Sequence, residues 1–310
     1  QGKKKQYETF IENATQIKPA TVIIGGELAP TTKLYTKTSQ YIDIQRVFLG
    51  EDLPALIKPL KQDLPKTNVF VILGNDDCAV NIDVLNSHPD LYQEIHGKRF
   101  RLDDNHEIVG YSFVPITPFG LKDFEKFDLS EVPEWAKAYY EDRKRTTYRL
   151  NGIRSVNKPD FGWEQYQFEQ AQETSDSIQR DLEAETFTAR PQNTIYVFHT
   201  PPHNAALDVI RDVMRGAVSV GSFAVREFIQ RYNPKLTLHG HIHETVDMTG
   251  KFMDVIGESV LISAGNDNEE SKVAIVEFDL YKPESAQRKK LPCGKIAKFF
   301  GGLFKNRSTF

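Results

Sequence analysis

Short apolar runs rich in β-branched residues recur along the chain, and they constrain its fold more than any other feature. The runs occupy residues 21–24, 69–73, 194–198 and 236–238. Tyr7, Ile11 and Ala14 recur at helical spacing before the first run, and residues 54–61 form a second expected helix before the next. Buried strands flanked by helices are typical of a sheet covered on both faces. The sequence therefore predicts a layered α/β protein.

Three further apolar runs, at residues 108–114, 260–262 and 273–278, predict a second sheet that is partly antiparallel. A Gly-Asn-Asp segment at residues 265–267 separates the last two runs and is typical of a hairpin turn. We therefore expect these two runs to pair with each other.

Residues 120–190 are richer in charged and aromatic side chains than the rest of the chain. About 70 residues are too many for a plain connection, so the segment predicts an inserted helical lid, with a helical stretch at residues 165–185. Its aromatic side chains suit two roles, namely packing a surface helical hairpin on the body or covering a substrate. These side chains are Trp135, Tyr139, Tyr140, Trp163, Tyr166 and Phe168.

Composition narrows the class of protein. The formal net charge of -4 gives no general attraction to nucleic acid, so no specific nucleic-acid partner is expected. Cys78 and Cys293 match no zinc spacing or disulfide framework, which fits a reducing cytosol. No signal peptide is visible, and no apolar run reaches the roughly 18 residues that a membrane span needs. We expect a cytoplasmic protein that is soluble or peripheral at a membrane.

Polar clusters follow the carboxyl ends of several predicted strands. Glu27 comes after the first run, Asn75 to Asp77 after the second, His199 after the third, and three alternating histidines at residues 239, 241 and 243 after the fourth. In open α/β sheets the crevice beyond the carboxyl ends of the strands is where ligands bind. The sequence therefore predicts that these clusters converge on one site.

Imidazole nitrogens, the Glu27 carboxylate and the Asn75 amide oxygen form a mixed N/O donor set that suits Mn, Fe or Zn. Two such ions roughly 3.5–4 Å apart could hold a bridging hydroxide and clamp the oxygens of an in-line displacement at phosphorus. A single hydrolytic zinc, with three protein ligands and one open position, is the alternative. The spacing does not separate the two.

These segments resemble the motifs of the calcineurin-like metallophosphoesterase superfamily. The sequence GHIH at residues 240–243 matches one block, His199 before Thr200 resembles a lone histidine, and GNDD at residues 74–77 resembles a third block. The resemblance follows the family order across nearly the whole chain. It implies a metallophosphoesterase domain at residues 1–285, folded as a four-layer α/β/β/α sandwich of two mixed sheets. It also implies hydrolysis of a phosphodiester or phosphomonoester by metal-bound hydroxide.

The resemblance also implies roles for single residues. Asn75, His199 and His241 would bind one of two divalent transition metal ions, His243 would bind the other, and Glu27 would bridge them. Asp76 occupies the catalytic position. Three residues would support the ligands from outside the metal sphere, and they are Asp77, His203 and His239.

The sequence departs from the family pattern at three places. No D-x-H motif precedes residues 21–24, which puts one metal site in doubt, and we expect that motif to lie upstream of Gln1. Glu27 replaces the usual aspartate, and Asp76 replaces the usual histidine, which can donate a proton more readily. Two functions follow as hypotheses. An active hydrolase is favoured, and a catalytically degenerate binding or scaffolding relative is the alternative.

The last segment, residues 286–310, reads as a basic amphipathic tail. No acidic residue follows Glu284, and basic residues recur from 288 to 307. Apolar side chains follow the pattern of one helical face, and they are Ile296, Phe299, Phe300, Leu303 and Phe304. Such a helix suits a membrane surface or a groove of a protein partner. The alternative is that this face packs on the protein's own body.

Overall fold

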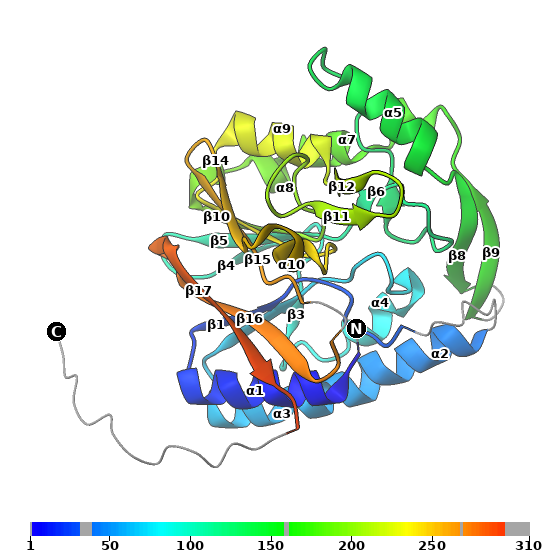
Figure 1. Cartoon of the computed structure of the whole chain (residues 1–310). Coiled ribbons are helices and arrows are strands. Elements are labelled where there is room, and N and C mark those ends of the chain that lie inside the picture. The colour runs from blue at the N-terminus through cyan, green and yellow to red at the C-terminus, as the bar shows by residue number, and fades with distance from the viewer. Residues whose placement is uncertain (1, 32–38, 158–160, 267–268, 295–310) are drawn as a thin grey trace.

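The computed structural model describes residues 2–31, 39–157, 161–266 and 269–294. It shows a mixed α/β protein whose strands lie between two groups of helices (Figure 1). A three-stranded parallel sheet has the order β1-β2-β3, and a six-stranded mixed sheet has the order β14-β15-β13-β10-β5-β4. The four central strands of the larger sheet run parallel, and the two edge strands run antiparallel.

The strands of these two sheets are short and mostly buried. Those of the smaller sheet are β1 (Thr21–Ile24), β2 (Asn68–Val71) and β3 (Gln93–Glu94). Those of the larger sheet are β4 (Arg99–Arg101), β5 (Glu107–Tyr111), β10 (Thr194–Phe198), β13 (Leu236–His239), β14 (Met253–Ile256) and β15 (Ser259–Ser263). Further two-stranded pairs are β6 (Val114–Pro115) with β7 (Glu125–Lys126), β8 (Asn151–Asn157) with β9 (Phe161–Gln167), β11 (Val209–Asp212) with β12 (Gly216–Ser219), and β16 (Lys272–Asp279) with β17 (Lys282–Pro292).

The helices form two groups, most of whose members lie at opposite ends of the view in Figure 1. The first group comprises α1 (Lys4–Ile17), α2 (Ser39–Val47), α3 (Leu53–Asp63) and α4 (Ile82–Leu85). The second comprises α5 (Lys137–Thr147), α6 (Gln172–Ser175), α7 (Ile178–Leu182), α8 (Glu185–Thr188) and α9 (Phe223–Tyr232). The short helix α10 (Thr245–Thr249) follows β13. A π-helical turn at Phe48–Asp52 joins α2 to α3, and 3-10 turns occupy Ala79–Asn81 and Pro191–Asn193.

The three largest buried apolar clusters pack helices against the sheets and strands against one another. One joins α1 and α3 to one face of β1 and β2, and Ile57 and Val71 belong to it. A second joins α7 and α9 to one face of the larger sheet, where Tyr196 and Phe228 belong to it. The third contains residues from β2 and from strands of the larger sheet, such as Phe70 and Ile195. The alternation of strand side chains between two buried faces explains the continuous apolar runs in the sequence.

The structure confirms the helix predicted before the first strand and the helix predicted at residues 54–61. The predicted hairpin between residues 260–262 and 273–278 is wrong. Strand β15 pairs with β13 and β14, and β16 pairs with β17. Because every residue of β15 is buried, this strand lies inside the sheet, where its two edges already have partners.

The helical stretch predicted at residues 165–185 is confirmed only in part. Residues up to Gln167 belong to β9, and the remainder contains α6, α7 and the start of α8, which non-helical residues separate. A new helix begins after Ser177, whose side chain accepts a hydrogen bond from the Arg180 amide and caps α7. The segment at residues 120–190 is thus only partly helical, because it also contains the β8–β9 hairpin.

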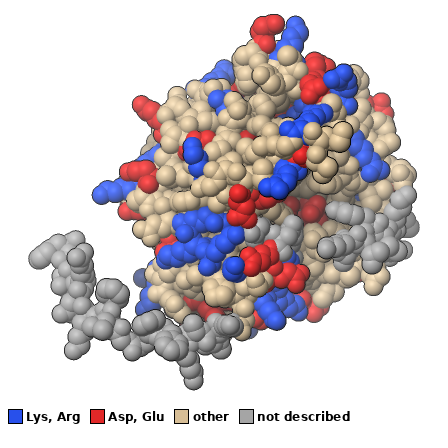
Figure 2. Space-filling model, in the orientation of Figure 1, with Lys and Arg blue, Asp and Glu red and all other residues tan. Residues whose placement is uncertain are grey.

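The predicted tail falls partly on a strand. Arg288, Lys289 and Lys290 belong to β17, which pairs with β16 through residue Pro292. The predicted amphipathic face at residues 296–304 lies outside the described residues. No helix in the described part of the chain is long and apolar enough to cross a membrane. On the face shown in Figure 2, acidic and basic side chains are interspersed.

Candidate metal centre

Four loops that carry predicted site residues meet beyond the carboxyl ends of the strands. Glu27 follows β1 and Asn75 follows β2 in the smaller sheet, whereas His199 follows β10 and His241 follows β13 in the larger sheet. Because the strands of each pair run parallel, both loops emerge at the same edge of their sheet. The structure brings these loops together, as the sequence predicted.

Glu27, His199 and His241 form the one group of potential metal ligands found among the described residues. One donor atom of each lies within 4.8 Å of the other two. The amide oxygen Oδ1 of Asn75 lies 2.7 Å from His241 Nδ1 and 3.1 Å from His199 Nε2. Both sheets contribute to this set, so it exists only in the folded chain.

The His199 imidazole is buried and enclosed by backbone. Its Nδ1 lies 2.9 Å from the Gly25 carbonyl oxygen, to which the Nδ1–H form donates, and Nε2 is then the nitrogen with a free lone pair. Three glycines adjoin the ring. A Cβ atom at Gly74 would lie 2.6 Å from His199 Nε2, and Cβ atoms at Gly26 or Gly240 would also crowd the ring.

Burial keeps two of the histidines in the neutral form that binds metal ions. It lowers the pKa of His199 below its usual value, although Glu27 opposes this effect. Burial, followed by the nearby His199, lowers the pKa of His241 to about 3. Both imidazoles are therefore neutral at pH 7, with lone pairs available as ligands.

Glu27 and His243 form a close pair, with 2.5 Å between Glu27 Oε2 and His243 Nε2. Burial alone would raise the pKa of the Glu27 carboxyl, but His243 and then His199 outweigh burial and lower it. Burial works against a charged His243, but Glu27 outweighs burial and raises the pKa of the imidazole. Glu27 is therefore ionised, and it connects His243 to the other donors.

Two of the donor residues adopt a left-handed backbone conformation. The φ angle is 52° at Glu27 and 64° at His241. Residues other than glycine rarely adopt this region, and it costs on the order of 1–3 kcal/mol per residue. Such strain clusters at functional sites, where the surrounding structure holds the side chains in place.

Asp77 is fully buried and connects two of the loops. Its carboxylate accepts hydrogen bonds from the amides of Leu28 and Ala29, at 3.0 Å each, and of Gly74, at 2.9 Å. It thereby joins the turn that carries Asn75 to the segment that follows Glu27. Burial raises the pKa of Asp77 to about 6, although these amides oppose the effect. Asp77 holds the turn, and none of its hydrogen bonds goes to a ligand histidine.

Asp76 lies beside the donor set. Its Oδ1 accepts a hydrogen bond of 3.2 Å from the Asn75 side-chain amide, and its carbonyl accepts from Tyr41 and Gln45. Burial, followed by the charge of Glu27, raises the pKa of Asp76 to about 7. A cation bound at Glu27 would favour the ionised form and lower this pKa.

The two other predicted supporting histidines have different surroundings. His239 contacts the carbonyl of Thr200 at 3.1 Å and the hydroxyl of Thr237 at 2.8 Å, so it adjoins the His199 loop. His203 instead stacks on Phe223 at 4.0 Å, with Nδ1 3.9 Å from Asp208. The contacts of His203 lie with α9 and its neighbours, and none of them is with a donor residue.

Residues outside the predicted motifs hold the 3-10 turn at Ala79–Asn81, which follows the Asn75 turn. The Asp123 carboxylate accepts hydrogen bonds from the Ala79 amide and from the Ser155 amide. It thereby joins this 3-10 turn to the β8–β9 hairpin of the inserted segment. Gly74 and Gly240 were visible as part of the motifs, but only the structure shows that they make room for the His199 ring.

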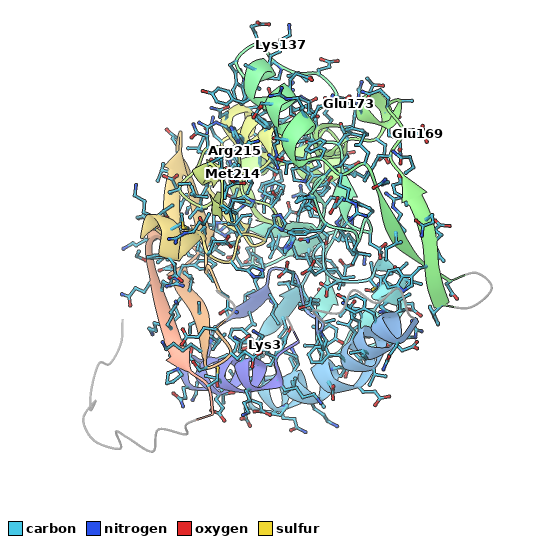
Figure 3. The ribbon with its side chains drawn as sticks, turned by 45° about the vertical axis from the view of Figure 1, so that its right-hand side comes forward. Lys3, Lys137, Glu169, Glu173, Met214 and Arg215 are labelled. Atoms are coloured by element: carbon cyan, nitrogen blue, oxygen red, sulfur yellow. The ribbon has the colours of Figure 1, made fainter. Side chains whose placement is uncertain are left out.

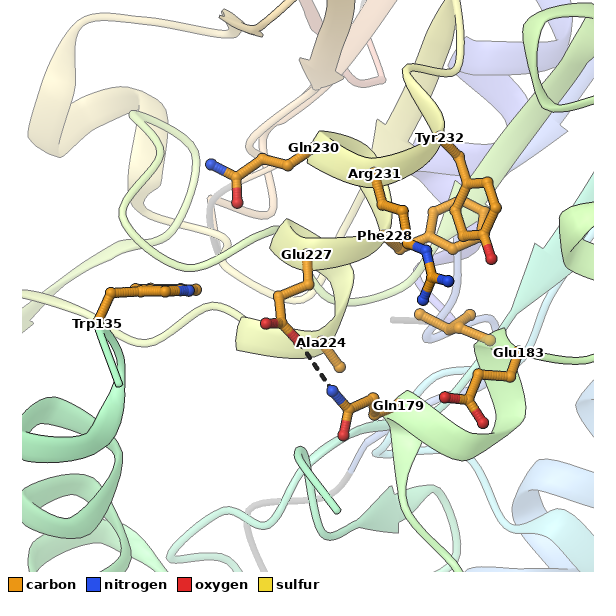
Figure 4. A pocket seen from close by; sticks show the side chains of 10 residues that line it. Trp135, Gln179, Glu183, Ala224, Glu227, Phe228, Gln230, Arg231 and Tyr232 are labelled. Carbon is orange, nitrogen blue, oxygen red and sulfur yellow. Dashed lines mark hydrogen bonds between the residues drawn. The ribbon is translucent and has the colours of Figure 1, made fainter. Parts of the chain in front are cut away.

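A separate pocket of about 380 Å³ lies among α7, α9 and Trp135 (Figure 4). Within it, Gln179 donates a hydrogen bond of 2.8 Å to Glu227. None of the predicted site residues lines this pocket. It is therefore distinct from the candidate metal centre.

The fold and this donor set define a mixed α/β protein with a candidate metal centre between its sheets. The chain matches the family described as calcineurin-like phosphoesterase over residues 1–245. The chain belongs to that family.

Similarity to individual proteins is low. One solved crystal structure is 14% identical, with a TM-score of 0.52, and the match covers 91% of this chain and 92% of the other. The crystal structure of TT1561 of Thermus thermophilus is 15% identical, with a TM-score of 0.45, and the match covers 93% and 92% of the two chains. No curated protein matches the chain. The similarity to the first of these two structures is a similarity of fold alone.

Proposed function

We propose that this protein is a metal-dependent phosphoesterase that hydrolyses a phosphodiester or a phosphomonoester. The observation that carries this proposal is the group of Glu27, His199 and His241, whose donor atoms lie within 4.8 Å of one another in a chain of this family. Imidazole, carboxylate and amide donors suit Mn, Fe or Zn.

The donor residues divide between two ions in this proposal. Asn75, His199 and His241 would hold one ion, because the Asn75 oxygen lies within 3.1 Å of a nitrogen of each histidine. His243 would contribute to the second site, and Glu27, which contacts His243, would connect the two sites. Bound divalent ions would polarise the phosphoester and lower the pKa of a water molecule.

The remaining residues position these ligands. The Gly25 carbonyl fixes the His199 ring, and Asp77 fixes the turn beneath Asn75. Asp76 is the proposed catalytic residue because its carboxylate lies next to the Asn75 amide. The inserted segment is the proposed lid, because Asp123 joins its β8–β9 hairpin to the 3-10 turn at Ala79–Asn81, which follows the Asn75 turn.

The α/β/β/α sandwich of the family fits the three apolar clusters. One cluster lies between each sheet and its helices, and the third contains strand residues of both sheets. We propose that the two sheets lie face to face across this third cluster. The donor loops then meet where the two carboxyl edges adjoin.

Metal analysis and a hydrolysis assay test the proposal together. We expect bound Mn²⁺ and hydrolysis of bis-p-nitrophenyl phosphate or p-nitrophenyl phosphate by the unaltered chain. His241→Ala should lower the affinity for Mn²⁺ and the rate by at least about a hundredfold, while the partly exposed His88→Ala serves as a matched control. A His241→Ala variant that is folded and as active as the unaltered chain would refute the assigned site.

The degenerate binding protein is the second candidate, because Asp76 stands where the family has a histidine. It predicts that the chain binds Mn²⁺ and loses it in His241→Ala, yet hydrolyses neither substrate. Asp76→His then separates the two candidates. If this replacement creates hydrolysis that the unaltered chain lacks, the binding function is favoured over the enzyme.

A further inference from the structure

The β11–β12 hairpin carries two apolar side chains at its tip. The side chains of Val213 and Met214 are 98% and 91% exposed, more than any other large hydrophobic residue among the described residues. Figure 3 shows Met214 and Arg215 beside each other on this hairpin. Adjacent apolar side chains that face solvent can enter a membrane interface together.

The tip has a defined conformation. The Asp212 carboxylate accepts hydrogen bonds of 2.8 Å from the amides of both Met214 and Arg215. The Arg215 guanidinium lies 3.5 Å from the Asp142 carboxylate on α5. The Arg143 side chain of α5 donates to the carbonyls of Val220 and Gly221, just beyond β12. These contacts join the hairpin to α5, and the hydrogen bonds to Asp212 order the turn at the tip.

The hairpin and α5 carry more basic than acidic side chains, whereas the whole chain has a net charge of -4. The hairpin and α5 together carry six basic residues, namely Lys137, Arg143, Lys144, Arg145, Arg211 and Arg215. They carry three acidic residues, namely Glu141, Asp142 and Asp212. Arg211 is exposed, and the Arg145 and Arg215 side chains are 80% and 45% exposed. These three exposed arginines can contact an anionic surface.

We propose that the β11–β12 hairpin and α5 dock the protein on an anionic membrane surface, with Val213 and Met214 inserted among the acyl chains. A bilayer accepts two side chains on a narrow tip, whereas a stable protein interface needs about 1,000 Å² or more of complementary surface. The arginines remain at the headgroups, where each basic residue adds to the attraction. This surface is independent of the proposed phosphoesterase site.

Vesicle co-sedimentation of the full chain tests this proposal. We expect the unaltered chain to bind phosphatidylcholine vesicles that contain phosphatidylserine, and to bind pure phosphatidylcholine vesicles less. The double replacement Val213→Ser with Met214→Ser should weaken binding about tenfold or more, since both side chains leave the acyl region. Val255→Ser is the matched control, because Val255 is 56% exposed on β14. The tail is present in every variant, so the difference reports on the hairpin.

A second measurement tests whether the tip enters the bilayer. Met214→Trp should show a blue shift of its fluorescence with phosphatidylserine vesicles, beyond the change in the unaltered chain. The proposal is wrong if the unaltered chain does not sediment with these vesicles, or if the double variant sediments equally well. It is also wrong if the double replacement abolishes only self-association, as measured by light scattering, because the tip would then be a protein contact.

Discussion

At the scale of single residues, the candidate metal centre requires glycines as well as ligands. Three glycines adjoin the His199 ring, namely Gly26, Gly74 and Gly240. Each of them directly precedes a proposed ligand in the sequence. A side chain at any of them would occupy space that the imidazole needs. The short motifs therefore specify a cavity for His199 in addition to donor atoms.

Gly74→Ala tests this requirement. The added Cβ would lie 2.6 Å from His199 Nε2 and 2.8 Å from the Glu27 amide nitrogen, and the backbone atom cannot move aside easily. We expect the affinity for Mn²⁺, measured by isothermal titration calorimetry, to fall at least about tenfold because the ring is displaced. We also expect a loss of stability of about 1–3 kcal/mol from overpacking.

Gly25→Ala is the matched control for that replacement. A Cβ atom at Gly25 meets no atom within 4 Å, and the Gly25 carbonyl that contacts His199 is retained. The control should bind Mn²⁺ like the unaltered chain. Equal affinities of the Gly74 and Gly25 variants would show that His199 does not need this space.

At the scale of elements, α9 is connected to the inserted segment at its first turn. The Asp128 carboxylate accepts hydrogen bonds from the amides of Phe223 and Ala224, at 2.7 and 3.2 Å, and from the Ser222 hydroxyl. The Ser222 hydroxyl oxygen accepts from the Val225 amide at 3.0 Å. Three of the amides that a helix start leaves unpaired are thus satisfied.

Separate replacements of Asp128 and of the N-cap residue Ser222 should show how much each contributes to the stability of the protein. Asp128→Ala leaves buried amides without an acceptor, so we expect a loss of about 2–4 kcal/mol in the free energy of unfolding. Ser222→Ala removes one acceptor and should cost about 1 kcal/mol. Urea denaturation measures both changes. If Asp128→Ala costs no more than Ser222→Ala, the carboxylate does not hold the helix.

At the scale of the whole molecule, the change in stability at acid pH is the sum of contributions from buried groups that act in opposite directions. Burial lowers the pKa of His96 to about 4 from an ordinary 6.5, while nearby Asp181 opposes and Lys126 and Lys98 assist. Burial instead raises the pKa of Asp123 to about 6 and of Glu125 to about 7. The carboxyl groups favour the fold as pH falls, whereas the histidine disfavours it.

A His96→Gln variant isolates the histidine. Between pH 6.5 and about 4, the unfolded chain binds a proton at His96 that the folded chain does not, so stability falls as pH falls. Between pH 7.5 and 5.0 this contribution is about 2 kcal/mol. We expect urea denaturation to show that the variant loses less stability over this interval than the unaltered chain. An equal loss in both would show that His96 titrates alike in the two states.

Much of the architecture could be predicted from the sequence because the signals are local. Helical spacing in α1, the apolar runs of β1 and β10, and the polar residues that follow them are all set by neighbouring positions. The family could also be predicted, because its short motifs occur in order along the chain. These features do not depend on how distant segments pair.

Strand pairing and the close contacts of the site were decided by tertiary structure. The turn at residues 265–267 suits a hairpin, yet β15 lies between β13 and β14, because burial of both its faces outweighs the local turn signal. The position of Asp77 beneath two loops and the enclosure of His199 likewise depend on residues far apart in sequence. The sequence by itself determined which donors this protein has, and only packing of the two sheets determined which of them meet, because burial and hydrogen bonding act between segments that the chain order does not relate.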